Sequence, residues 1–131
     1  MATGGTTTND SNPTNQPPAI EGYGGGGFRV DGVLHKGSII VLPTRVAEWA
    51  VEEFAQIDEA LLPPALFGDA HVELVLLGCG VRMQPVPRAL RETLSAVGTV
   101  VEPMDTGAAV RTYNVLLGEN RRIAAALVAV D

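Results

Sequence analysis

Residues 100–130 constrain the fold of this 131-residue chain more than any other stretch, because they predict a strand, a helix and a second strand in close succession. A short apolar run follows Gly98 and is typical of a buried strand. The apolar period becomes helical from Ala108, and Gly118 is expected to end that helix with a positive φ. Residues 123–130 are almost continuously apolar. We therefore expect a final strand that is covered on both faces.

Asp105 and Thr106 stand where the predicted helix begins, and either side chain can accept hydrogen bonds from free backbone N–H groups there. Capping alone explains both residue types. The free N–H groups and the helix dipole also favour an anion or a carbonyl oxygen at this position. Arg111 and Asn114 are three apart and share one face of the helix. The predicted apolar stripe comprises Ala109, Tyr113, Leu116 and Leu117.

A strand and a helix are also predicted before this unit. Residues 72–77 form an apolar run, and residues 87–97 are amphipathic, with Pro87 suited to the first turn and Gly98 to the stop. Right-handed crossover makes the strands at 72–77 and 100–101 parallel, so their carboxyl ends lie on one edge of the sheet. Ligands bind at such edges in open α/β sheets. These ends carry Gly78, Cys79, Gly80 and the segment 104–107.

The N-terminal third is expected to be antiparallel β-structure preceded by a tail. Residues 1–18 have almost nothing to bury, so we expect a disordered tail before one domain at 19–131. Residues 20–30 are expected to form a flexible loop before a strand, although their four consecutive glycines permit close backbone approach. Asp31-Gly32 predicts a hairpin turn. Residues 38–42 predict a strand that Pro43 ends.

Two segments are harder to interpret. Residues 44–57 fit a helix capped by Thr44, but alternation around Trp49 equally fits a strand. Residues 58–67 predict a short helix, which Pro63-Pro64 interrupts or starts.

Composition excludes several classes of function. The formal charge is −6, from 9 basic and 15 acidic side chains, which argues against binding to nucleic acid or to anionic membranes. The apolar runs are too short to span a bilayer, and the first residues lack the pattern of a secretory signal. The single cysteine, Cys79, cannot form an intramolecular disulfide, which is compatible with a cytoplasmic location.

The candidate chemistry is sparse. Cys79, His35 and His71 have no metal-ligand spacing, so we expect no metal and no cofactor. Cys79 follows a strand where a thiol can be exposed, but a small buried residue explains it better. The literal G-x-G-x-x-G within residues 22–27 has no preceding strand or following helix. The D-T-G triplet of aspartic proteases, at 105–107, opens a predicted helix instead of lying in a β framework. No nucleophile–base pair is visible.

Several short motifs resemble the Mth938-like family over residues 20–130, above all M-D-T-x-x-A-x-x-T-Y-N at 104–114. The resemblance implies three layers: a central mixed sheet, helices on one side, and a β-hairpin layer plus a helix on the other. It also implies that the segment around Trp49 is extended. Relatives in this family include a mitochondrial assembly factor for respiratory complex I, and bacterial members have no established activity. The remaining matches are Gly22-Tyr23-Gly24, Phe28-Arg29, Gly32, Leu42-Pro43, Trp49 and Gly78-Cys79-Gly80.

Two functions follow from these observations. The first is a non-enzymatic binding or assembly protein that presents a cleft at the strand ends to an unidentified protein partner. The second is an enzyme or sensor for a small anionic metabolite, with Asp105 as base. Both monomer and homodimer are compatible with the sequence. The predicted cleft residues are Arg29, Gly78, Cys79, Gly80, Asp105, Thr106, Gly107, Arg111, Tyr113 and Asn114.

Overall fold

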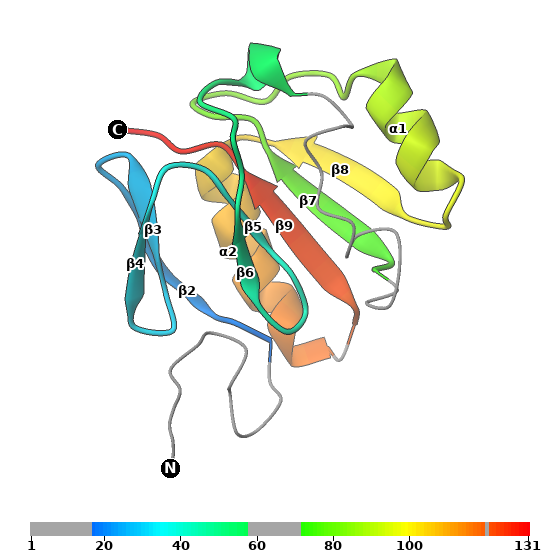
Figure 1. The fold of residues 1–131 in the computed structure, drawn as a ribbon. Coiled ribbons are helices and arrows are strands. Elements are labelled where there is room, and N and C mark those ends of the chain that lie inside the picture. Colours follow the sequence, from blue (N-terminus) through cyan, green and yellow to red (C-terminus); the bar gives the residue numbers. More distant parts are fainter. Residues whose placement is uncertain (1–16, 58–71, 120) are drawn as a thin grey trace.

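The computed structural model describes residues 17–57, 72–119 and 121–131 (Figure 1). Within them lie two α-helices, α1 (Arg88–Ser95) and α2 (Thr106–Leu116), and two 3₁₀ turns, η1 (Phe54–Gln56) and η4 (Leu117–Glu119). The strands are β2 (Ile20–Gly24), β3 (Gly27–Val30), β4 (Val33–Lys36), β5 (Ile39–Val41), β6 (Val46–Glu48), β7 (Leu74–Gly78), β8 (Val100–Met104) and β9 (Ile123–Leu127).

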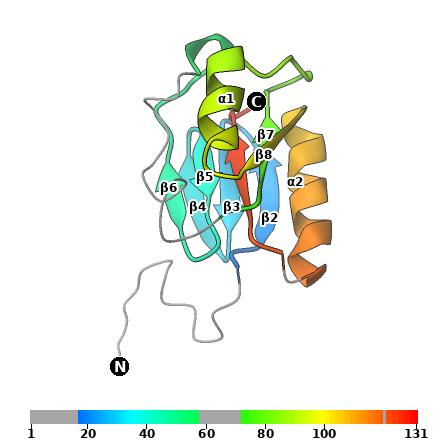
Figure 2. The same ribbon diagram turned by 90° about the vertical axis from the view of Figure 1, so that its right-hand side faces the viewer.

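The central sheet has five strands in the order β6-β5-β9-β7-β8. β7 pairs in parallel with both β8 and β9, and β5 pairs antiparallel with β9 and β6, so the predicted mixed sheet is confirmed. The chain steps from β7 to β8 through α1, then back across β7 to β9 through α2. Because these steps run in opposite directions, right-handed crossovers place the two helices on opposite faces (Figure 2).

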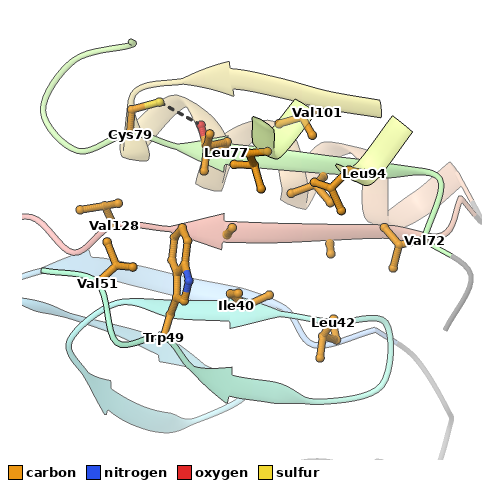
Figure 3. Packing of buried hydrophobic residues seen from close by; sticks show 14 residues of the cluster. Ile40, Leu42, Trp49, Val51, Val72, Leu77, Cys79, Leu94, Val101 and Val128 are labelled. Carbon is orange, nitrogen blue, oxygen red and sulfur yellow. Dashed lines mark hydrogen bonds between the residues drawn. The ribbon is translucent and has the colours of Figure 1, made fainter. Parts of the chain in front are cut away.

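Each face of the central sheet has its own hydrophobic layer. On β7, Leu74 and Leu76 point to one face, and Val75 and Leu77 point to the other. The first face is covered by α2 and by the sheet β2-β3-β4, and the second by α1 and the segment around Trp49 (Figure 3). The three-layer architecture is therefore confirmed.

The glycine-rich segment is not a loop, so that prediction was wrong. Residues 20–24 form β2, which pairs antiparallel with β3 and places Gly24 opposite Gly27. Gly25 and Gly26 make the turn between them, both with positive φ (61° and 81°), which glycine adopts without a Cβ clash. Residues 20–24 therefore form a strand because they pair with β3, although their sequence lacks the usual alternation of apolar and polar side chains. The next turn, at Asp31-Gly32, is the predicted two-residue hairpin turn between β3 and β4.

Gly27 and Gly22 are expected to respond very differently to alanine. A Cβ at Gly27 would lie 2.5 Å from the carbonyl oxygen of His35 on the neighbouring strand, whereas a Cβ at Gly22 would meet nothing within 4 Å. We expect Gly27→Ala to lower the free energy of unfolding by about 2–3 kcal/mol. The matched Gly22→Ala should be neutral or stabilise by about 0.5 kcal/mol. Urea denaturation of both variants measures this, and equal midpoints would refute the close approach.

The structure also describes the segment around Trp49 and the two glycines that were expected to end helices. The segment around Trp49 is extended, with β6 before it and only η1 after it, as the family resemblance implied. Gly98 has a φ of 83° just after α1, as expected for a residue that ends a helix. Gly118 has no positive φ and lies inside η4, because the chain continues in 3₁₀ geometry after α2.

The helix predicted at 58–67 and most of the tail at 1–18 lie outside the described residues. In the described ranges, no helix is long and apolar enough to cross a membrane.

Candidate functional site

The two turns after β7 and β8 meet at a common rim. The backbone N–H of Cys79 donates to Met104 O at 2.8 Å, and the N–H of Thr106 donates to Gly80 O at 2.8 Å. The Thr106 hydroxyl accepts from Gly80 N at 3.0 Å and donates to Val128 O at 2.7 Å. Thr106 is fully buried. One side chain therefore ties together the ends of β7 and β9 at the start of α2.

Most backbone N–H groups at the N-terminus of α2 donate hydrogen bonds within the protein. Asp105 is the cap, and its Oδ1 accepts from the N–H of Ala108 at 2.8 Å. The N–H of Thr106 already donates to Gly80 O. A Cβ at Gly107 would lie 2.5 Å from the hydroxyl oxygen of Tyr23, so the β2 strand reaches over the first turn of the helix. The capping role of Asp105 is confirmed, and few N–H groups are left for an external anion.

A cleft of about 1090 Å³ opens at this rim. Four of the predicted site residues line it, namely Cys79, Gly80, Asp105 and Gly107. The other walls come from β2, from the segment around η1, from the loop after β7 and from the residues after β9. These walls comprise Tyr23, Glu52, Glu53, Phe54, Ala55, Val81, Arg82, Met83, Gln84, Pro85, Val128, Ala129, Val130 and Asp131.

Gly78 and Thr106 lie beneath the rim instead of lining the cleft. Both are buried, and a Cβ at Gly78 would lie 2.9 Å from Leu127 Cδ2 and 3.1 Å from the Cα of Thr106. A larger residue at position 78 would therefore clash, because α2 packs directly against β7.

Tyr113 and Asn114 attach α2 to the start of β2, away from the cleft. The hydroxyl of Tyr113 is buried and donates to Pro18 O at 2.6 Å. The amide of Asn114 donates to Ile20 O at 2.7 Å and accepts from Ile20 N at 3.2 Å. Tyr113 and Asn114, the last two residues of the motif at 104–114, therefore attach the second sheet to the helix.

The two predicted arginines do not line the cleft. Arg29 is exposed on β3, and its guanidinium approaches Gly32 O at 3.5 Å. Arg111 is exposed on α2, and its Nη1 would lie 3.3 Å from a Cβ at Gly107, so it covers the outer side of the first turn.

Cys79 is a buried free thiol. Its Sγ donates to the carbonyl oxygens of Leu77 at 3.5 Å and Gln84 at 3.7 Å. Burial raises the pKa of the Cys79 thiol, which keeps it protonated at neutral pH. In the described ranges, no group of three His, Cys, Asp or Glu residues could hold a metal ion.

Thiol labelling should confirm this environment. A neutral, buried thiol is a poor nucleophile, so we expect 5,5′-dithiobis(2-nitrobenzoate) to react at least about tenfold more slowly with the folded protein than with the urea-unfolded chain. Because Cys79 is the only cysteine, the signal has a single source. Equal rates in both states would show that the thiol is accessible.

The sequence prediction missed the apolar side chains around the cleft. Val81 is 90% exposed, Met83 57% and Tyr23 44%. The signal was present, because residues 81–85 place two large apolar side chains in a segment that was assigned to no helix or strand. Exposed apolar side chains that lie together indicate an interaction surface.

The lining is also acidic. Four acidic side chains line the cleft, Glu52, Glu53, Asp105 and Asp131, against one basic side chain, Arg82. The described residues show no ion pair for any of the five. The cleft therefore favours positive over negative charge.

The sequence is similar to proteins of one family. A family model described as a protein of unknown function (DUF498/DUF598) matches residues 20–128. An uncharacterized protein of Rhodobacter capsulatus is 38% identical over 109 residues, which are 83% of this chain and 82% of that protein. A Danio rerio protein named NADH dehydrogenase (ubiquinone) 1 alpha subcomplex assembly factor 3 is 32% identical over 83% of this chain. That match covers 63% of the assembly factor's own length.

Solved structures of similar proteins support the same family. A crystal structure from Bartonella henselae, described as an outer membrane protein, has a TM-score of 0.80 and 37% identity, and the match covers 89% of this chain and 98% of that one. A solution structure from Bordetella pertussis, described as a Mth938-like domain, has a TM-score of 0.72 and 28% identity, covering 98% of this chain and 92% of that one. The chain therefore belongs to the DUF498/DUF598 family and has the Mth938-like fold.

Proposed function

We propose that this protein is a non-enzymatic binding or assembly protein, and that a protein partner docks at the cleft between the ends of β7, α2 and β9. The observation that carries the proposal is the exposure of Val81, Met83 and Tyr23 around that cleft. Burying such side chains against a partner is favourable, by about 25 cal/mol per Å² of apolar surface. Relatives named as complex I assembly factors support a role in protein association.

The chemistry of the cleft favours this role over catalysis. The thiol of Cys79 is buried and protonated, and Asp105 uses one carboxylate oxygen to cap α2. Among the described lining residues, there is no nucleophile hydrogen-bonded to a base, which covalent catalysis would need. The acidic lining also opposes a small anionic substrate.

A pair of charge insertions tests the docking surface. We expect Val81→Asp with Met83→Asp to abolish co-purification of partner proteins from the native host, because two charges would have to be desolvated at the interface. The matched control is Val100→Asp with Val115→Asp, which places the same two charges on valines that are 55% and 69% exposed and lie outside the cleft. Quantitative mass spectrometry of the captured proteins is the measurement. The same proteins captured by both variants would rule out docking at the cleft.

A further inference from the structure

The loop after β7 leaves its backbone unpaired along the cleft. Residues 81–84 lie between Gly80 and Pro85 and belong to no helix or strand; the chain bends at residues 80–82. Within the described part of the chain, none of their four N–H groups donates a hydrogen bond, and only Gln84 O accepts one, from the Cys79 thiol. Unpaired backbone groups at a surface can pair with the backbone of a bound chain.

The side chains next to this segment define what such a chain should carry. Val81 and Met83 are two residues apart, and both side chains are exposed. Another part of the cleft lining is formed by Glu52 and Glu53, both exposed. Gln56 Oε1 accepts from the backbone N–H groups of both glutamates, at 2.6 and 3.0 Å, which fixes their backbone.

We propose that the cleft binds an extended, positively charged peptide segment of the partner, with apolar residues on Val81 and Met83 and Lys or Arg side chains toward Glu52 and Glu53. This inference rests on the proposed function and adds the chemistry of the partner. Charge complementarity is its second support, since the lining carries four acidic side chains and one basic side chain. Backbone pairing along residues 81–84 contributes affinity, and the glutamates contribute the selection for charge.

Peptide probes test this directly. The probes are fluorescently labelled peptides of about nine residues, which span roughly 30 Å when extended. One alternates Lys with Val, and its counterpart has Glu in place of every Lys. Fluorescence anisotropy measures binding to the wild type, to Glu52→Gln with Glu53→Gln, and to Glu48→Gln with Glu102→Gln. The last variant removes the same two charges at exposed positions outside the cleft.

We expect the Lys peptide to bind the wild type and the Glu peptide not to bind. The Glu52/Glu53 variant should bind the Lys peptide about three- to tenfold more weakly, and the Glu48/Glu102 variant should bind like the wild type. If both variants bind the Lys peptide equally weakly, the effect comes from the net charge of the protein, and the proposal is overturned. Equal binding of the Lys and Glu peptides by the wild type would also overturn it. A Lys peptide N-methylated at alternate residues should also bind more weakly; unchanged binding would refute backbone pairing.

The outcomes separate the two proposals. If Val81→Asp with Met83→Asp abolishes partner capture but the peptides show no charge preference, docking at the cleft stands and the cationic segment is wrong. If capture is unaffected by those substitutions, docking at the cleft itself is wrong.

Discussion

Replacing Thr106 by valine should destabilise the protein by about 2–6 kcal/mol, although the two side chains have nearly the same shape. The hydroxyl of Thr106 accepts from Gly80 N and donates to Val128 O, and the residue is fully buried. Valine would leave a buried donor and a buried acceptor without partners, each at a cost of about 1–3 kcal/mol. Urea denaturation followed by circular dichroism measures the change.

The control for this substitution lies on the same helix. Thr112 is only partly buried, and its hydroxyl makes no hydrogen bond within the described residues. Thr112→Val keeps the same change in chemistry and in χ1 preference, so we expect a change within about 0.5 kcal/mol. A Thr106→Val variant as stable as this control would show that the rim does not depend on the hydroxyl.

Removing Tyr113 should have a similarly large effect. We expect Tyr113→Ala to cost about 3–5 kcal/mol, since the ring is fully buried between α2 and the first face of the central sheet. Tyr113→Phe should cost about 1–2 kcal/mol, because it removes only the donor to Pro18 O. The control is Tyr23→Phe, which removes the hydroxyl of a tyrosine that is 44% exposed and should change stability by less than about 0.5 kcal/mol.

Alkaline pH offers an independent measurement on Tyr113. Burial, and to a lesser degree the negative charge of Asp31, raises the pKa of Tyr113 well above its ordinary value of 10.0. The unfolded chain therefore loses this proton first, so stability is complete below the unfolded pKa and falls as pH rises above it. The expected loss is about 1.4 kcal/mol per pH unit from this group. Tyr113→Phe should lack this component, and parallel pH profiles for the two proteins would contradict the assignment.

Local interactions explain why part of the structure was predictable. The Asp105 cap joins a side chain to an N–H three residues away, and the Asp31-Gly32 turn depends on two consecutive φ angles. The α2 and β9 segments were recognised because their apolar periods span a whole element. The parallel order of β7 and β8 followed from the handedness of one crossover. Each of these features is decided by residues within one or two elements.

The missed features depend on segments that are far apart in the sequence. β2 lacks a strand pattern, and pairing with β3 is what makes it a strand. Tyr113 and Asn114 lie on the helix as predicted, but only packing shows that their partners are Pro18 and Ile20, more than ninety residues earlier. The cleft likewise required the η1 segment and the loop after β7 to line the same space, although they are far apart in the sequence.

Short motifs were enough to indicate the family by resemblance, and the mixed sheet followed from that resemblance. A capping residue and a change of apolar period were enough to locate the N-terminus of α2, because both are short-range properties of the chain. Tertiary packing alone decided which polar side chains of the motif at 104–114 hydrogen-bond to distant segments. It also decided which side chains remain exposed at the surface. Hydrogen-bond partners and burial depend on which distant segments meet, and no pattern within one segment specifies the segment that will cover it.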